Sequence, residues 1–372
     1  MRRRHFIAVS FVFGAGRLLA QAPATEPKKP AELAMTWHDP QGWGVEGRAW
    51  EDQKRLRWYD RLPAAAEATV TKAVWGLSRH SAGMAVRFRT DSPVIRVKYK
   101  LRLTKLAMPH MPATGASGVD LYAKDPAGKW RWVAVSKPTS PEVSATLVDK
   151  IPATAREWMM YLPLFNEVES LEIGVAEGAS FEGLAPRKEN LIVFYGTSIT
   201  HGACASRPGM THVAMLGRRL DVPTLNLGFS GNGKMDAAVG EFLGQLDPAV
   251  FVIDCLPNMS PQEVTGKTIP LVKQLRAARA ATPILLVESR RNTESWINPG
   301  LQGLHSAKHG ALKAEFEKLK AEGVTGLFYL TGNDLLGDDA DAATDGSHPS
   351  DLGFYRQADA FEPVLKEILK RP

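Results

Sequence analysis

The sequence is poor in cysteine and lacks the motifs of several common classes of protein. Its 372 residues contain two cysteines, Cys204 and Cys255, which are too few for a disulfide scaffold and fit no metal-binding spacing. There is no glycine-rich phosphate loop, nicotinamide fingerprint or cluster of metal ligands, so we expect neither a metal nor a cofactor. His305 and His309 lie four residues apart on a predicted helix without a third ligand, which favours an exposed helix face over a metal site. For the two cysteines, one disulfide and two buried free thiols both stay open.

The sequence also has no basic stripe and no membrane-spanning run. Part of the formal net charge of +6 lies at the two ends of the chain, and no Lys/Arg-rich stripe with interleaved aromatic residues occurs. This distribution argues against nucleic-acid binding. The apolar stretch at residues 6–16 is too short to cross a bilayer, so we expect no membrane span.

What is present at the N-terminus resembles an export signal. Residues 1–22 combine a basic start, the short apolar stretch and small residues near Ala20 and Ala22, which predicts a signal peptide. The sequence RRHFI at residues 3–7 is similar to a twin-arginine signal. Residues 23–34 are rich in Pro and Lys and predict a linker. We therefore expect an exported protein, periplasmic or secreted, with the twin-arginine route as a candidate for its export.

The chain is longer than one core usually sustains, and its two halves differ in pattern. Residues 35–185 contain short runs in which apolar and polar residues alternate, separated by Gly, Pro and Asp. Clear examples are residues 84–91 and 94–103, and no run in this half predicts a helix. Such a pattern is typical of antiparallel sheets. We expect an N-terminal antiparallel β-sandwich, jelly-roll-like, over residues 35–185.

The second half, residues 186–372, alternates continuous apolar runs with amphipathic segments. The apolar runs have no polar alternation, as expected of parallel strands buried on both faces, and they are residues 191–195, 223–228, 249–256, 283–288 and 326–330. The segments between and after them predict helices over residues 207–220, 234–246, 261–281, 306–322 and 350–370. Repeated β–α units of this kind predict a flavodoxin-like α/β/α domain with a five-stranded parallel sheet.

In an open α/β sheet, functional groups lie just past the carboxyl ends of the strands. Ser198 follows the first apolar run, Gly231 the second and Asn258 the third, while Asp345 and His348 lie beyond the fifth. A serine hydroxyl becomes a nucleophile when a base lies within hydrogen-bond reach. We expect His348 to be that base and Asp345 to orient its imidazole. The sequence thus predicts a catalytic triad.

The same strand ends supply donors for a developing oxyanion. We expect an oxyanion hole made of the backbone N–H groups of Ser198 and Gly231 and the side-chain amide of Asn258. Arg207 and Asn232 lie close behind the first two strand ends and are candidates for substrate binding. Arg207 also fits a helix-capping role.

Each of these residues has a plainer explanation when it is taken alone. Ser198 fits a helix N-cap, Gly231 a turn glycine, Asn258 a loop or cap residue and His348 a surface loop. Their occurrence in order at four predicted strand ends favours the catalytic interpretation.

The order of these residues resembles the SGNH hydrolases of the GDSL esterase/lipase superfamily, which are named after a serine, a glycine, an asparagine and a histidine in separate sequence blocks. YGTSITHG is similar to the first block, GFSGNG to the second, PNMS to the third and DGSHPSDLGF to the fifth. Two departures are Leu-Pro-Asn-Met at residues 256–259, in place of the commoner Gly-x-Asn-Asp, and GTSIT in place of Gly-Asp-Ser-Leu. The resemblance implies a serine hydrolase and agrees with the residues assigned above.

The first half carries a second resemblance. GVDLY at residues 118–122 is similar to the Gly-x-Asp-Leu-Tyr signature of a β-sandwich domain found in front of a subset of SGNH esterases. Enzymes of that layout are mostly carbohydrate esterases, so the resemblance implies removal of acetyl groups from an acylated oligo- or polysaccharide. Alternatives are a lipid-directed esterase, lysophospholipase or thioesterase and, in another class, a non-catalytic carbohydrate-binding protein. The oligomeric state stays open.

Overall fold

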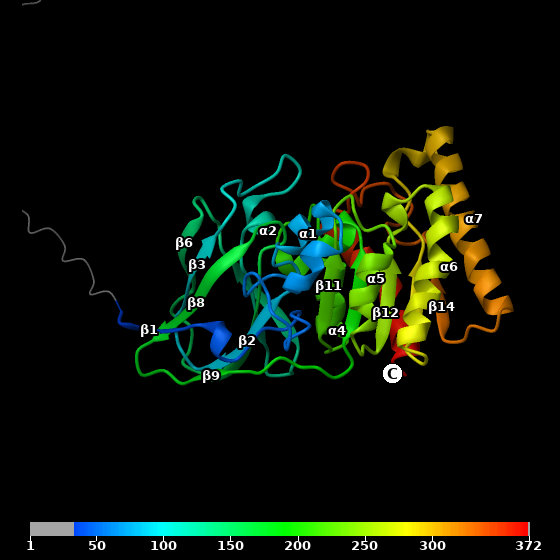
Figure 1. Ribbon diagram of the computed structural model, residues 1–372. Coiled ribbons are helices and arrows are strands. Elements are labelled where there is room, and N and C mark those ends of the chain that lie inside the picture. Colours follow the sequence, from blue (N-terminus) through cyan, green and yellow to red (C-terminus); the bar gives the residue numbers. More distant parts are fainter. Residues whose placement is uncertain (1–32, 371–372) are drawn as a thin grey trace, which may run out of the picture. The chain divides into compact units, whose positions relative to one another are not determined.

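The computed structural model describes residues 33–370, and the chain from Ala34 onward forms one compact unit (Figure 1). The predicted signal peptide, residues 1–22, and almost all of the predicted linker, residues 23–34, lie outside the described residues. None of the helices within residues 33–370 combines the length and the apolar character that crossing a membrane requires.

The first half of the described chain forms two antiparallel sheets. One sheet contains, in spatial order, β1 (Met35–His38), β8 (Val168–Ala176), β3 (Ile95–Leu101) and β6 (Glu142–Val148). The other contains β5 (Trp130–Val135), β4 (Asp120–Lys124), β7 (Arg156–Tyr161), β2 (Ala85–Thr90) and β9 (Phe181–Gly183). Inward-facing residues of both sheets, among them Phe88, Val97, Trp158 and Ile173, share one core. The predicted antiparallel sandwich is confirmed.

The second half contains a parallel sheet with the strand order that defines a flavodoxin-like fold. In residues 33–370 its strands are, in spatial order, β11 (Thr224–Gly228), β10 (Ile192–Gly196), β12 (Val250–Asp254), β13 (Ile284–Val287) and β14 (Leu327–Leu330). All neighbouring pairs are parallel. In this order, 2-1-3-4-5, β11 is added on one side of β10 and the later strands on the other, so the strand order reverses between β10 and β12. The predicted fold class is confirmed, and β10, whose carboxyl end leads to the serine, lies at this reversal.

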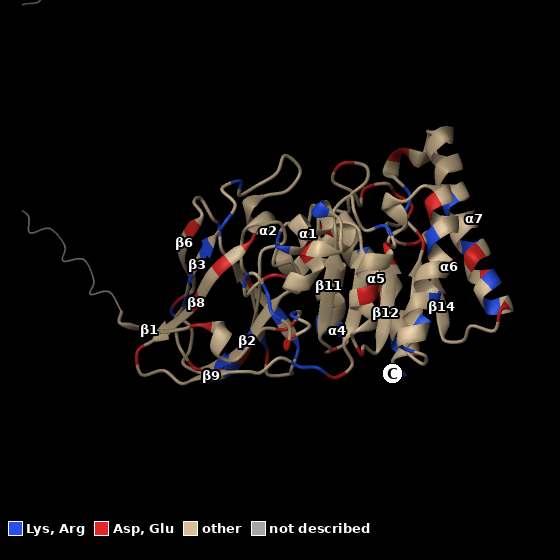
Figure 2. Cartoon of the chain, in the orientation of Figure 1, with Lys and Arg blue, Asp and Glu red and all other residues tan. Residues whose placement is uncertain are grey.

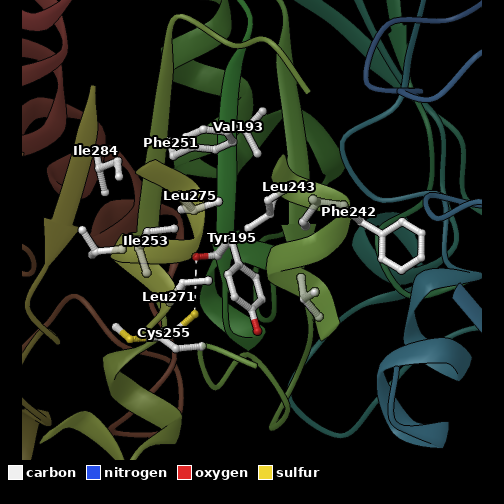
Figure 3. Packing of buried hydrophobic residues seen from close by; sticks show 14 of the residues in the cluster. Val193, Tyr195, Phe242, Leu243, Phe251, Ile253, Cys255, Leu271, Leu275 and Ile284 are labelled. Carbon is white, nitrogen blue, oxygen red and sulfur yellow. Dashed lines mark hydrogen bonds between the residues drawn. The ribbon is translucent and has the colours of Figure 1, made fainter. Parts of the chain in front are cut away.

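Helices cover both faces of the parallel sheet. On one face, α5 (Ala237–Gly244), α6 (Pro261–Ala278) and α7 (Pro299–Ala321) contribute to the core around Tyr195 and Ile253 (Figure 3). On the other face, α4 (His212–Arg219) and α8 (Asp351–Ile368) share a core with Phe194 and Val252. Because adjacent residues of one strand point to opposite faces, each strand feeds both cores, and this explains the unbroken apolar runs.

Helix α7 begins seven residues before the predicted start at residue 306. The side chain of Asn298 accepts a hydrogen bond from the Leu301 N–H, and Pro299 occupies the first turn, so together they form an N-terminus that the apolar periodicity does not reveal. The solvent face of α7 carries charges of both signs (Figure 2), including an ion pair between Lys313 and Glu317. Its opposite face packs into the core through Leu312 and Phe316.

The segment between β1 and β2 of the sandwich also packs on the parallel sheet. Buried apolar residues of this segment, including Trp50 and residues of the short helix α1 (Lys72–Ser78), belong to the same core as β10 and β11. The Trp50 ring meets the ring of Phe242 on α5 edge-on, with centroids 6.2 Å apart. Nearby, the fully buried guanidinium of Arg61 donates to the carbonyl oxygens of Asn226 and Gly228 at 2.9 and 2.8 Å. Arg61 thus covers the free edge of β11. Because this part of the first half packs on the sheet of the second, a domain boundary at residue 185/186 stays a prediction.

Candidate active site

Ser198 lies at the first position of a short helix that follows β10. This helix, α3 (Ser198–His201), is capped by Thr197, whose side chain accepts a hydrogen bond from the Ile199 N–H at 3.3 Å. Thr197 therefore caps the helix, and the Ser198 hydroxyl can bond to another partner. That partner is His348, because Ser198 Oγ lies 2.8 Å from His348 Nε2.

Asp345 and His348 lie on the loop between β14 and α8. Asp345 Oδ2 lies 2.8 Å from His348 Nδ1, and Asp345 Oδ1 accepts the backbone N–H groups of Ser347 and His348 at 3.1 and 2.7 Å. Partial burial raises the pKa of this carboxyl, but the hydrogen bonds from His348 and Ser347 outweigh it and lower the pKa to about 2. With Nδ1–H donating to the carboxylate, Nε2 accepts from Ser198. The structure therefore joins the serine, the histidine and the aspartate in one hydrogen-bonded chain.

The glycine-bracketed loop after β11 packs against the turn that carries Ser198. The Phe229 N–H donates to the Gly196 carbonyl oxygen at 2.9 Å. A Cβ on Gly233 would lie 1.9 Å from the same oxygen, so this position has no room for a side chain. Gly231 differs, because its φ is +70° while the space around it is open. Close backbone approach is thus the requirement at Gly233, and a left-handed conformation is the requirement at Gly231.

Asn258 connects this loop to the end of β12. It ends the short 3-10 helix Leu256–Asn258, and with its amide oxygen turned toward the loop it accepts the N–H groups of Gly231, Asn232 and Gly233 at 3.3, 3.1 and 3.2 Å. The side chain of Asn232 donates to the Ser230 carbonyl oxygen at 2.9 Å. The structure therefore brings Gly231, Asn232 and Asn258 into one network, in which the Gly231 N–H donates to the Asn258 amide oxygen.

Arg207 contacts the sandwich. Its guanidinium donates to Asp120 Oδ2 at 3.0 Å and to the Tyr122 hydroxyl, and it lies 4.7 Å from the centre of the Trp132 ring. Asp120 is buried and also accepts the Gly209 N–H at 2.8 Å. The aspartate and tyrosine of the GVDLY sequence thus hold residues 207–209 of the second half. These contacts favour a structural role for Arg207, and its contact with substrate stays a prediction.

Arg290 is a residue of the site region that the sequence analysis missed. It follows β13, is 5% exposed, and donates from Nε to the Ser347 carbonyl oxygen at 2.7 Å and from Nη2 to Ser347 Oγ at 2.6 Å. Burial lowers its pKa to about 10, so the group stays charged at neutral pH. The only signal in the sequence is its place, since it stands just past the one apolar run for which we predicted no site residue.

Asp254, the last residue of β12, was also missed. Its carboxyl accepts the Thr200 hydroxyl at 3.0 Å, and burial raises its pKa to about 7 despite that hydrogen bond and the charge of Arg290. The pair links the end of β12 to α3 directly beneath the serine turn. A carboxyl at a strand end in the sequence does suggest a site, but its protonation depends on burial that the sequence does not reveal.

Two expectations about histidine and cysteine are settled by burial. His305 and His309 are 4% and 8% exposed, so an exposed helix face was the wrong interpretation. The helix packs its first turns against the loop after β13, where His309 Nε2 lies 2.9 Å from the Ser289 carbonyl oxygen and the Asn292 N–H donates to His305 Nε2 at 3.2 Å. Cys204 and Cys255 are both buried free thiols, which decides between the two alternatives.

Comparison with known proteins identifies the family. Residues 189–366 match the GDSL-like lipase/acylhydrolase family, and residues 35–181 match a domain described as the N-terminus of SGNH-hydrolase-type esterases. A protein described as a GDSL-like lipase from Bacteroides ovatus is 34% identical, with a TM-score of 0.86, over 91% of this chain and 98% of its own. The chain belongs to this family, the SGNH hydrolases, as the sequence resemblance implied. Membership supports an ester hydrolase.

Two more distant structures share the fold. The salicylyl-acyltransferase SsfX3 from a tetracycline biosynthetic pathway is 19% identical, with a TM-score of 0.71, over 95% of this chain and all of its own. A family two carbohydrate esterase from Clostridium thermocellum, solved with cellohexaose, is 15% identical, with a TM-score of 0.55, over 78% of this chain and 93% of its own. The comparison with curated proteins gave no match.

Proposed function

We propose that the protein is a serine esterase that removes small acyl groups, in particular acetyl groups, from carbohydrates. The observation that carries the proposal is the hydrogen-bonded chain from Ser198 through His348 to Asp345. The distances are those of a nucleophile, its base and the acid that orients the base. Membership of the SGNH hydrolases supports ester hydrolysis as the reaction.

The proposed reaction has two halves. In the first, Ser198 Oγ attacks the ester carbonyl carbon while His348 Nε2 takes the hydroxyl proton, and the same proton then goes to the departing sugar oxygen. In the second, His348 takes a proton from water, the resulting hydroxide attacks the acyl-enzyme, and Ser198 leaves with that proton. Asp345 keeps the imidazole oriented and stabilises its charged form. Because the pKa of Asp345 is about 2, the carboxyl stays ionised throughout.

The developing oxyanion needs donors fixed in advance. We assign this role to the N–H groups of Ser198 and Gly231 and to the side-chain NH2 of Asn258. The Gly231 N–H also donates to the Asn258 oxygen at 3.3 Å and would be shared between the two acceptors. When the Asn258 oxygen accepts the loop N–H groups, its NH2 points the other way and is free to donate. The N-terminus of α3 adds its positive end close to Ser198. Removing one donor of this kind typically lowers turnover on the order of 10²–10³-fold.

Two observations support a carbohydrate substrate: the two-domain layout and the similarity of the fold to a carbohydrate esterase. The GVDLY domain precedes the hydrolase domain, and a structure of similar fold is a carbohydrate esterase solved with cellohexaose. Export of the chain by its proposed signal peptide, residues 1–22, fits a substrate outside the cytoplasm. We propose an acylated oligo- or polysaccharide as the substrate.

Acetate release from a panel of acetylated glycans tests this proposal, with p-nitrophenyl esters of increasing acyl length as a second series. We expect turnover on acetyl esters that is lost in Ser198→Ala and in His348→Ala. A preference for acyl chains of eight or more carbons would favour the lipid-directed alternative. Absence of turnover on all of these esters would favour the carbohydrate-binding alternative.

A further inference from the structure

Three side chains that bind metals elsewhere in biology converge beside the catalytic residues. The ring nitrogens of His110, Sγ of Cys204 and a carboxylate oxygen of Asp345 offer donor atoms that all lie within 4.8 Å of one another. They come from the loop between β3 and α2 (Ala113–Ala116), the segment after α3 and the loop before α8. Residues 33–370 form no other group of this kind. Because the three residues lie far apart in the sequence, no spacing pattern reveals the cluster.

The donors are available for a ligand. Within the described part of the chain no hydrogen bond holds the imidazole of His110, whose ring instead stacks on the ring of His348 with centroids 5.8 Å apart. Cys204 forms no disulfide, and its thiol lies within hydrogen-bond reach of the Thr344 side chain, which a cation would replace. The oxygens of Asp345 accept bonds from Ser347 and His348 and keep a further lone pair for another partner. Asp345 is exposed, His110 is half-buried and Cys204 is buried, so an ion from solvent approaches from the side of Asp345 and His110.

We propose that His110, Cys204 and Asp345 form a binding site for a thiophilic divalent cation such as Zn²⁺, and that its occupancy inhibits the enzyme. An imidazole, a thiolate and a carboxylate are the ligand types that Zn²⁺ takes, at distances of about 2.0–2.3 Å. Ligand atoms of a tetrahedral site therefore lie roughly 3.5 Å apart. Binding requires the His110 and Cys204 side chains to rotate until the present separations close, with water in the fourth position.

Binding is a ligand exchange without oxidation or reduction. The Cys204 S–H bond breaks, its proton passes to solvent, and the thiolate electron pair forms the bond to the cation. Water molecules leave the cation as the imidazole and the carboxylate replace them. The inhibitory consequence rests on the proposed function. A cation that draws in the Asp345 carboxylate withdraws the group that orients His348.

Two measurements on the full chain test the site. In the first, the esterase rate is followed while Zn²⁺ is added. Saturating Zn²⁺ is expected to lower kcat by roughly 10²- to 10⁴-fold, up to the loss that follows a triad-acid substitution, and a chelator should restore the rate. In the second, Co²⁺ replaces Zn²⁺, and a thiolate-to-cobalt charge-transfer band is expected in the near ultraviolet. The cobalt spectrum does not depend on esterase activity.

Variants test whether the Zn²⁺ inhibition and the cobalt band both come from this cluster. Cys204→Ala is expected to keep the rate of the metal-free enzyme while losing the cobalt band and the inhibition. His110→Ala should show weakened inhibition relative to its own metal-free rate. Cys255→Ala is the matched control, because Cys255 is the other buried thiol of a chain with two cysteines and lies outside the cluster. It should keep the band and the inhibition.

Three results would overturn the proposal. No cobalt band in the wild-type protein would mean that the cluster binds no thiophilic cation, whether or not the enzyme is an esterase. Zn²⁺ inhibition that persists in both Cys204→Ala and His110→Ala would place the ion elsewhere. A cobalt band without any inhibition by Zn²⁺ would contradict the claim that the ion withdraws Asp345 from His348. An inactive wild-type protein that still shows the band would count against the proposed function alone.

Discussion

Arg290 donates two hydrogen bonds to Ser347, the residue that precedes His348 and follows Asp345 by two positions. A buried cation thus holds the backbone of the loop that carries two of the three residues of the proposed triad. Neither residue forms a hydrogen bond with Ser198 in the described structure, but their contact holds the backbone next to His348. We infer that Arg290 is a positioning residue.

Replacing Arg290 is expected to lower kcat with little change in KM on p-nitrophenyl acetate. Misplacing a reacting group by about 1 Å can cost on the order of 10²-fold, and we expect a loss of that order in Arg290→Met. Arg290→Lys should recover only part of it, because an ammonium cannot reproduce the two-pronged contact. Steady-state kinetics at matched folded fractions measure the effect.

The neighbouring Arg291 provides the matched control, since it is exposed. Arg291→Met should behave as the wild type. Equal losses in both variants, or a rise in KM at constant kcat in Arg290→Met, would contradict the positioning role.

The raised pKa of Asp254 should make the free energy of unfolding depend on pH. Burial raises the pKa of its carboxyl to about 7 in the folded state, above the unfolded value of about 3.9. Between these values the folded state binds the extra proton, so this group makes unfolding easier as the pH rises from about 4 to 7. The contribution is at most about 4 kcal/mol, at about 1.4 kcal/mol for each pKa unit.

Asp254→Asn removes that titration and can keep the acceptor for Thr200. Urea unfolding at pH 5 and pH 8 should show the variant gaining stability relative to the wild type at the higher pH. A difference between the two proteins that does not change with pH would show that Asp254 titrates normally.

Gly231 and Gly233 are expected to respond differently to alanine. At Gly233 the new Cβ would lie 1.9 Å from the Gly196 carbonyl oxygen, so the loop must move away from the serine turn. We expect a large loss of both stability and kcat. At Gly231 the space is open and the φ of +70° costs alanine roughly 1–2 kcal/mol, so the variant should fold with a modest loss of stability. Thermal unfolding and kinetics of the two variants make the comparison, and equal effects would contradict it.

Replacing Arg207 distinguishes a structural role of this side chain from a contact with substrate. Because its guanidinium is held by Asp120 and Tyr122, Arg207→Met should lower the midpoint of thermal unfolding and leave KM for an acetylated oligosaccharide unchanged. The variants Arg207→Met, Asp120→Asn and the double variant should not be additive in stability, since the two side chains share one contact. A raised KM at unchanged stability would instead assign Arg207 to substrate binding.

Local periodicity explains why much of the fold could be predicted. Strands β10 to β13 are buried on both faces and β14 is half-buried, so all five read as apolar runs. Looking just past the strand ends then leads to Ser198 and His348. Strand β6 gives a weaker apolar signal because it lies at the edge of its sheet, where Glu142, Ser144 and Thr146 face solvent and the inner face is only half-buried.

Contacts between distant segments explain most of what could not be predicted. The pairing of Arg290 with Ser347, and the approach of His110 to Asp345, depend on how separate loops meet at one edge of the sheet. His305 has the spacing of an exposed helix face and is buried only because the loop after β13 folds over it. No pattern within one segment carries that information.

Labelling with a fluorophosphonate, followed by mass spectrometric mapping of the adduct, is the sharpest test of Ser198 as the nucleophile. The reagent forms a stable bond with a serine whose hydroxyl is activated by a neighbouring base. We predict one adduct, on Ser198, that is lost in Ser198→Ala and strongly slowed in His348→Ala. A folded wild-type protein without an adduct, or with its adduct on another serine, would contradict the assignment of Ser198 as the nucleophile.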